Sequence, residues 1–184
     1  MPDSQALAAL CEAILAIAGE PVRVETLAEV AGEGVTAADI EGALEVVATR
    51  HRQAGSGIML ERVAGGFRLA TRPEHESAIR AFLGARARGR LSQAALETLA
   101  IVAYRQPVTL PEVNFLRGVN SASVMRTLME HKLVRVAGRK QVVGTPLLYR
   151  TTGEFLVHFG IADLSELPDP EGAEETVTGG GGAG

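Results

Sequence analysis

The sequence predicts a mainly α-helical (α+β) fold with small β-hairpins, organised as two tandem winged-helix, or helix-turn-helix, domains. Residues 91–149 place two amphipathic helical segments, a turn, a third helical segment and a hairpin in the order of a winged helix. Residues 4–71 repeat this order more faintly. At 184 residues, 46% of them hydrophobic, the chain can bury one ordinary core or two small ones.

The second half opens with a helix that Ser92 is placed to cap and that Pro107 ends. Its apolar residues recur at the three-to-four spacing of a helix with one buried face, and they are Ala95, Leu96, Leu99, Val102 and Ala103. Thr109 and Glu112 then have the spacing of a capping box, in which each side chain satisfies a backbone N–H of the other residue. We therefore expect a short second helix from this pair to Gly118, a residue type that commonly ends helices.

The third helix of this half is expected over residues 121–131, with core-facing residues Val124, Met125 and Leu128. The apolar runs at 133–136 and 147–149 predict two strands joined by a polar, glycine-containing loop. A final short helix is expected over 152–159, ended by Gly160. Together these elements complete one winged-helix domain.

The first half follows the same plan. Helices are expected over residues 4–18, 25–31 and 36–53, and strands over 58–63 and 67–71. Thr36, with Asp39 three residues later, can cap the third helix. The two strands flank Ala64-Gly65-Gly66, which is a hairpin signal.

The two halves can be aligned as an internal repeat. An offset of 86 residues pairs Leu10 with Leu96, Pro21 with Pro107, Val22 with Val108, Leu27 with Val113 and Gly32 with Gly118. After this last pair the offset becomes 84. Matches at helix stops and core positions favour a duplicated domain, although two unrelated three-helix domains would share some of them by chance.

These patterns divide the chain into four parts. We expect an N-terminal winged-helix domain over 1–83, a basic linker over 84–90, a C-terminal winged-helix domain over 91–167 and an acidic, glycine-rich tail over 168–184. The linker arginines form either a solvated connector or a contact with phosphates or an acidic partner. The tail lacks core-forming residues and is expected to be disordered.

No arrangement of side chains predicts catalysis or a metal site. The single cysteine, Cys11, excludes an intramolecular disulfide and has no cation near it in sequence that would activate its thiol. The four histidines lack the spacing of zinc ligands. We therefore expect no catalytic residue, no metal, no cofactor and no small-molecule ligand. Because no apolar stretch is long enough to span a membrane and no signal sequence opens the chain, a cytoplasmic location is expected.

The charge distribution permits nucleic-acid binding without requiring it. Residues 91–161 carry 8 basic and 4 acidic groups, and residues 162–184 carry no basic and 6 acidic groups. A dedicated DNA-binding domain usually has a more positive surface, since phosphate contacts supply most of the non-specific affinity. Asp39, Glu41 and Glu45 on the third helix of the first half would repel phosphates. The second half offers a thin set of contacts, namely Ser121, Ser123, Arg126, Arg139 and Lys140.

Apolar residues beyond the needs of a core indicate protein partners. The first helix is apolar on more than one stripe, as expected if part of it packs on a second copy of the chain. The dimer-interface candidates are Leu7, Leu10, Ile14, Leu15 and Ile17. In the second half, the apolar side chains that could contact a partner helix are Tyr104, Val108, Phe115, Met125 and Met129. For each of these residues the alternative is an ordinary core position.

Several motifs resemble those of the segregation and condensation protein B (ScpB) family. They lie at residues 91–104, 106–107, 117–121, 126–128, 138–139, 146–149, 151–152, 154–156, 159–160, 164–168 and, in the first half, 64–73. The resemblance covers nearly all of residues 5–168. One departure is Thr145, where the family usually has an arginine before the proline. Any contact that the family makes through that arginine is left open for this chain.

The resemblance implies the small accessory subunit of the bacterial SMC condensin. It implies two winged-helix domains, homodimerisation mainly through the first, and binding of the kleisin subunit, segregation and condensation protein A (ScpA), largely by the second. Through the kleisin the chain would join the SMC ATPase in chromosome condensation and segregation during cell division, in the cytoplasm at the nucleoid, without hydrolysing ATP. DNA contact would be weak or indirect, and no membrane is involved.

For single residues, the motifs and the apolar surplus suggest a kleisin-facing surface, or the support beneath it, formed by Tyr104, Arg105, Arg117, Asn120, Met125, Arg126, Met129 and Tyr149. A winged-helix DNA-binding transcription regulator is the alternative function, and it predicts DNA binding that depends on salt and on sequence. An enzyme is the third hypothesis, and it predicts a turnover that is lost when one polar residue is changed.

Overall fold

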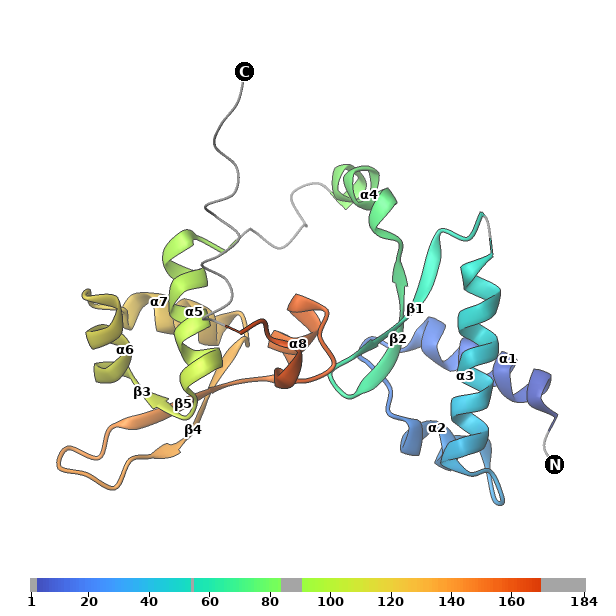
Figure 1. The fold of residues 1–184 in the computed structure, drawn as a ribbon, viewed down its shortest axis with the longest axis horizontal. Coiled ribbons are helices and arrows are strands. Elements are labelled where there is room, and N and C mark those ends of the chain that lie inside the picture. The colour runs from blue at the N-terminus through green and yellow to red at the C-terminus, as the bar shows by residue number, and fades with distance from the viewer. Residues whose placement is uncertain (1–2, 54, 84–90, 170–184) are drawn as a thin grey trace.

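The computed structural model describes residues 3–53, 55–83 and 91–169, which form a mixed α/β structure of helices and small antiparallel sheets (Figure 1). The expected linker at 84–90 and the expected tail from residue 170 onward lie outside the described residues. Two separate hydrophobic cores divide the described chain. We call residues 3–83 the N unit and residues 91–169 the C unit.

The N unit consists of α1 (Ser4–Ile17), α2 (Val24–Ala31), α3 (Ala37–Arg52), β1 (Ile58–Val63), β2 (Gly66–Thr71), a 3-10 turn (Pro73–His75) and α4 (Glu76–Leu83). The predicted capping box of α3 is confirmed, since the Asp39 backbone N–H donates to Thr36 Oγ1 at 3.2 Å and the Thr36 backbone N–H donates to Asp39 Oδ2 at 2.9 Å. Buried apolar side chains of α1, α2 and α3 form the core. By contrast, α4 has no buried residue among those described.

The C unit consists of α5 (Gln93–Arg105), β3 (Val108–Thr109), α6 (Leu110–Arg117), α7 (Ala122–Glu130), β4 (Val134–Arg139), β5 (Leu147–Thr151), α8 (Gly153–Phe159) and a 3-10 turn (Leu164–Glu166). The predicted caps are confirmed here too. Thr109 and Glu112 form a capping box at α6, and Gly118 ends that helix in the left-handed conformation with φ of 71°.

A short extended segment adds to the hairpin of each unit in the same way. In the C unit β3 pairs with β5, with Val108 opposite Tyr149. In the N unit Val22 forms an isolated bridge with Phe67, and each backbone N–H donates to the other residue's carbonyl at 2.8 Å. Gly66 permits this approach, since a Cβ on it would lie 2.8 Å from the carbonyl oxygen of Val22.

The repeat offset of 86 holds from the prolines onward and is wrong for the first helices. Leu27 and Val113, which are 86 apart, are both buried. In α1 and α5, however, the matching buried residues lie 88 apart, as with Cys11 and Leu99 or Leu15 and Ala103. The cause is that α1 ends four residues before its proline and α5 ends two residues before its own. Leu96, which we expected in the core from the spacing of apolar residues in this helix, is 41% exposed.

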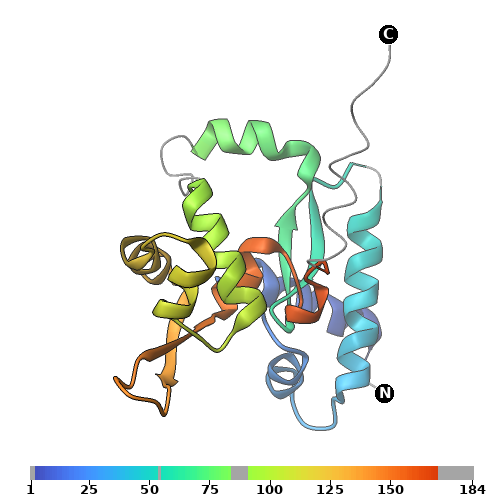
Figure 2. The same cartoon turned by 60° about the vertical axis from the view of Figure 1, so that its left-hand side comes forward.

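The two units touch where the β1–β2 turn meets the segment after α8 (Figures 1 and 2). The backbone N–H of Ala64 donates to the carbonyl of Ile161 at 3.0 Å, and that of Gly65 donates to the carbonyl of Ala162 at 2.9 Å. Val63 beside this turn is fully buried, although it belongs to neither core. The N-unit hairpin therefore serves as an internal connector between the units.

Candidate partner-binding surfaces

An apolar groove lies between α5 and α6 on the surface of the C unit. Two adjoining hollows of about 500 and 640 Å³ share Arg105 and Leu116 as lining residues. We define the α5–α6 groove by Ile101, Tyr104, Arg105, Pro107, Pro111, Phe115 and Leu116. The Phe115 side chain is 85% exposed, which is unusual for an aromatic residue without a partner.

The short length of α6 explains this exposure. Val113 is the fully buried residue of the eight in this helix, and it faces the core of the C unit. Since successive helical residues are about 100° apart, Phe115 points about 200° away from Val113 and cannot reach the same core. The helix therefore carries an apolar side chain on the outside that its own fold does not use.

Tyr104 and Arg105, both predicted as kleisin-facing residues, line the α5–α6 groove. The Tyr104 hydroxyl donates to the backbone carbonyl of Pro168 at 2.6 Å, while the ring remains half-exposed. The end of the described chain is thus attached to α5 beside the groove. Arg105 is exposed, so its guanidinium is available to an acidic group on a partner.

Arg117 and Asn120, also predicted as kleisin-facing, instead hold the connection between α6 and α7. Arg117 Nη1 donates to Ser121 Oγ at 3.0 Å and Nη2 donates to Glu97 at 2.9 Å, and the side chain is only 9% exposed. The guanidinium, together with Gln93, lowers the pKa of the Glu97 carboxyl. Asn120 Oδ1 accepts the backbone N–H of Ala122 at 2.9 Å. Arg117 therefore supports the surface from beneath, while Asn120 is exposed at the start of α7.

The other kleisin candidates divide between core and surface. Met125 and Tyr149 are 2% and 8% exposed and pack in the core of the C unit, so the prediction that they face a partner is wrong and a supporting role is left. Arg126 and Met129 lie on the exposed side of α7. The eight candidates therefore do not form one surface. Sequence reasoning missed Ile101, Pro107, Pro111 and Leu116, although the adjacent apolar pair at the end of so short a helix was a usable signal.

The α1 candidates for a dimer interface also divide. Leu7 and Leu15 are buried in the core of the N unit, where α1 packs on α3, so they are wrong as surface residues. Leu10 and Ile17 are 38% and 86% exposed, and Ile14 is half-buried. The exposed side of α1 also carries the small residues Ala6, Ala9, Ala13 and Ala16. This side is the part of α1 that remains available to a second copy.

Glu112 connects α6 to the β4–β5 hairpin. Its carboxylate accepts Lys140 Nζ at 2.5 Å and the backbone N–H of Thr109 at 2.8 Å. These hydrogen bonds, that from Lys140 first, lower the pKa of Glu112 to about 2. The predicted capping residue is thus also an anchor for the hairpin.

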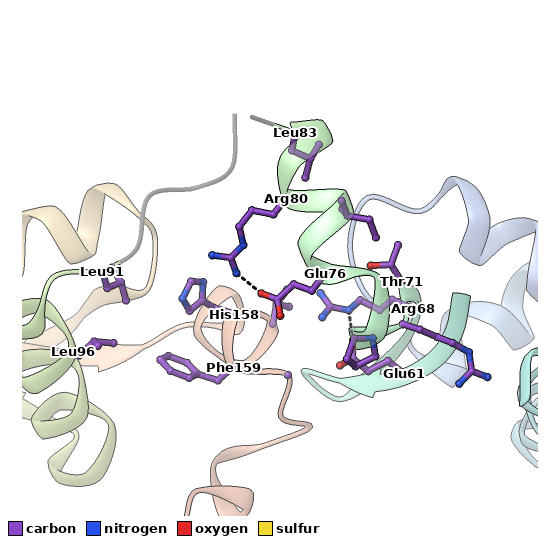
Figure 3. Close-up of a pocket in the computed structure, with 15 residues that line it drawn as sticks. Glu61, Arg68, Thr71, Glu76, Arg80, Leu83, Leu91, Leu96, His158 and Phe159 are labelled. Atoms are coloured by element: carbon purple, nitrogen blue, oxygen red, sulfur yellow. Dashed lines mark hydrogen bonds and ion pairs between the residues drawn. The ribbon is translucent and has the colours of Figure 1, made fainter. Parts of the chain in front are cut away.

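A cleft of about 960 Å³ opens between the two units, and Figure 3 shows the residues that line it. Glu61 accepts a hydrogen bond from Arg68 at 2.7 Å, and Glu76 pairs with Arg80 on α4. Phe159 and His158 border the cleft from α8. Within the described ranges no group of three or more His, Cys, Asp or Glu residues could hold a metal ion.

Cys11 lies in the core of the N unit. The Cys11 thiol is buried, and burial raises its pKa. A thiol in this state is a small apolar core group. No helix in the part of the chain that the structure describes is long and apolar enough to cross a membrane.

Comparison with known proteins gives a consistent set of relatives. The family model described as "Segregation and condensation complex subunit ScpB" matches residues 9–170. Segregation and condensation protein B of Syntrophotalea carbinolica is 45% identical over 166 residues, covering 90% of this chain and 83% of that protein. A crystal structure of ScpB from Mycobacterium tuberculosis is 34% identical, with a TM-score of 0.42 over 88% of this chain and 99% of that one. A structure described as a dimer of the ScpB N-terminal domain complexed with ScpA peptide is 28% identical, with a TM-score of 0.38 over 41% of this chain and 91% of that one.

Proposed function

Since the chain belongs to the segregation and condensation complex subunit ScpB family, we propose that it is a non-enzymatic subunit of the bacterial SMC–kleisin condensin complex. A homodimer of the chain binds the kleisin ScpA and, through it, joins the SMC ATPase in the cytoplasm at the nucleoid. The complex takes part in chromosome condensation and segregation during cell division. The chain acts as a scaffold and hydrolyses no ATP.

The proposal assigns the two binding roles to two winged-helix domains. Residues 1–83 form the dimerisation domain, residues 91–167 form the kleisin-binding domain, and 84–90 and 168–184 are linker and tail. The assignment is supported by the order helix, helix, turn, helix and hairpin in each unit and by the separate cores. It is also supported by the hairpin-adding segment that both units share.

The observation that carries the kleisin assignment is the exposed apolar lining of the α5–α6 groove. Phe115 and Leu116 are 85% and 49% exposed beside the Tyr104 ring. An amphipathic helix docks in such a groove through residues spaced three or four apart, and Arg105 at its edge suits an acidic group of the partner. We therefore place the ScpA contact at this groove.

The dimer contact is assigned to the exposed side of α1. Small residues at Ala6, Ala9 and Ala13 allow a second helix to approach closely, while Leu10 and Ile17 supply apolar area. This side is free because the opposite face of α1 is occupied by the core of the N unit.

The test is a light-scattering mass measurement of the purified 19.3 kDa chain alone and mixed with ScpA. A dimer that forms a heavier discrete complex is expected. Phe115→Glu is expected to weaken ScpA binding at least about tenfold, because it places a charge in an apolar contact. Phe82→Glu on α4 is the matched control, since Phe82 is a similarly exposed (89%) aromatic of the N unit.

The binding results of these variants distinguish the possible positions of the kleisin site. Loss of binding in Phe82→Glu with normal binding in Phe115→Glu would move the kleisin site to the N unit. Loss only in Met129→Glu would move it to α7. A chain that never changes the mass of ScpA would contradict the scaffold function itself.

The dimer is tested separately with Ile17→Glu, which is expected to give a monomer that still binds ScpA. Val30→Glu is the control, since Val30 is an exposed apolar residue (61%) on α2 rather than α1. A monomer in both variants, or in neither, would contradict the assignment of the interface to α1.

A further inference from the structure

The β4–β5 hairpin and the elements beside it hold positive charge that neither proposed protein contact uses. Residues 119–153 contain six Lys or Arg and one Asp or Glu, a net charge of +5 in a chain whose total is −4. Lys140 is neutralised by Glu112, and Glu130 is the acidic residue within the segment. The remaining cations are Arg126, Lys132, Arg135, Arg139 and Arg150.

Two of these arginines face each other across the hairpin. Arg135 on β4 is the direct register partner of Arg150 on β5, and both are exposed. Directly opposed residues of antiparallel strands project from the same face, and like charges there are destabilising. Neither arginine forms an ion pair within the described ranges. An anion bound on this face would remove the repulsion.

The hairpin is a convex, preformed arm. It projects away from the N unit in both views of the molecule (Figures 1 and 2). Its loop is held by backbone hydrogen bonds from Val142 to Lys140 and from Thr145 to Val142, both 2.9 Å long, and Arg139 Nη1 donates to the carbonyl of Thr145 at 3.2 Å. At the tip Val143 is fully exposed.

We propose that this hairpin is a contact for the phosphate backbone of duplex DNA, independent of base sequence. A two-stranded ribbon fits the major groove of the duplex, and the net charge of +5 over residues 119–153 complements the phosphates that border it, so we take duplex DNA as the partner. The Arg135 and Arg150 guanidiniums each present paired N–H donors that match the oxygens of a phosphate. The contact is weak by itself and gains from tethering when the chain is part of a larger complex on DNA.

The test uses the full chain and a labelled duplex of about 30 base pairs with mixed sequence, with fluorescence anisotropy recorded at several salt concentrations from about 50 mM upward. Binding is expected at the lowest salt and is lost steeply as salt rises. Arg135→Glu and Arg150→Glu are each expected to lower the affinity at least about tenfold. Each is also expected to reduce the slope of log affinity against log salt by about 1 to 2.

Two controls keep the test specific. Each variant places a carboxylate opposite the remaining arginine, so folding is preserved and thermal stability is not expected to fall. Arg23→Glu makes the same change of charge at an exposed position of the N unit and is expected to leave DNA binding nearly unchanged. ScpA binding, measured by the mass of the complex, is expected to be normal in the two hairpin variants.

Three results would overturn the proposal. The first is no anisotropy change with the unmodified chain at about 50 mM salt. The second is an equal loss of binding in Arg23→Glu, which would show an effect of net charge rather than of the hairpin. The third is binding of poly-glutamate that is tighter than binding of duplex and is lost in Arg135→Glu, which would indicate an acidic protein partner.

Discussion

The two hairpins of this chain have the same place in the element order and opposite surroundings. In β1–β2, Glu61 is paired directly opposite Arg68 and the tip is bonded to the C unit through Ala64 and Gly65. In β4–β5, two arginines are opposed and the tip is free. A hairpin whose charges are satisfied within the fold can serve as a connector. The opposed arginines of β4–β5 have no such pairing within the hairpin, and they are the basis of the proposed contact with DNA.

The two units differ in which helix is held at its ends by side-chain hydrogen bonds. In the N unit the capping box is at the third helix, α3, whereas in the C unit it is at the second helix, α6. The end of α6 carries Arg117, which reaches Ser121 and Glu97, while the equivalent residue of α2 is Ala31. The C unit thus fixes the helix that presents the α5–α6 groove.

The largest expected effect disrupts the pairing of a short extended segment with the hairpin, a feature that both units have. Gly66→Ala would place a Cβ 2.8 Å from the carbonyl oxygen of Val22, and backbone cannot move aside easily. We expect the free energy of unfolding to fall by about 2–3 kcal/mol in urea denaturation. Gly42→Ala on α3, where nothing lies within 4 Å, is expected to raise it by about 0.5–1 kcal/mol. Equal effects at the two glycines would contradict this account.

The next effect removes the hydrogen bonds of Arg117, which have no counterpart at Ala31 in the N unit. Arg117→Ala gives α6 the small residue that α2 carries at this position and removes the hydrogen bonds that Arg117 donates to Ser121 Oγ and to Glu97 Oε2. We expect a loss of about 1–2 kcal/mol in the free energy of unfolding. Arg105→Ala, which removes an exposed arginine from α5, is the control and is expected to change it by less than about 0.5 kcal/mol. If the two variants are equally stable, the hydrogen bonds of Arg117 do not stabilise the fold.

A smaller effect depends on pH. The folded pKa of Glu112, about 2, lies below its ordinary value of 4.5, so the ionised carboxylate stabilises the fold above about pH 5, and this contribution is lost as the pH falls toward 2. Glu112→Gln is expected to cost about 1 kcal/mol at pH 7. The difference from the unmodified chain should shrink toward zero near pH 2, as measured by urea denaturation at several pH values. A difference that is constant with pH would rule out the carboxylate as the cause.

The smallest effect exchanges the charge patterns of the two hairpins. Arg135→Glu gives β4–β5 the opposite-charge pair of β1–β2 and is expected to stabilise the chain by about 0.2–1 kcal/mol. Glu61→Arg creates the like-charge pair in β1–β2 and should destabilise by a similar amount. Thermal unfolding of the two variants side by side measures both shifts. Shifts of the same sign would show that the cross-strand charges do not act as described.

The helix caps and helix stops were predictable from the sequence because the interactions that form them lie within a few residues. The capping pairs Thr36 with Asp39 and Thr109 with Glu112 were predicted by spacing alone and are present. The helix stops at Gly118 and Gly160 are likewise confirmed, both glycines having positive φ. The strand β3 was not predicted as a strand, since two residues are too few to show an alternation.

The orientation of apolar helices was predictable only in part. In α1, Leu7 and Leu10 are alike in chemistry, yet Leu7 is in the core and Leu10 is at the surface. A helix that is apolar on two sides does not indicate which side meets its own fold. For the same reason Leu96 was assigned to the core and is exposed, while Met125 was expected both in the core and at a partner surface and lies in the core.

By itself the sequence determined the order of three helices and a hairpin in each unit, several of their caps and stops, and the resemblance to the ScpB family, because these depend on residues close together in the chain. The tertiary structure alone decided which apolar side chains form the α5–α6 groove, that Arg135 opposes Arg150, and that the β1–β2 turn bonds to Ile161 and Ala162. Each of these features joins segments that the sequence separates, so each depends on how distant elements pack and not on a pattern within a few neighbouring residues.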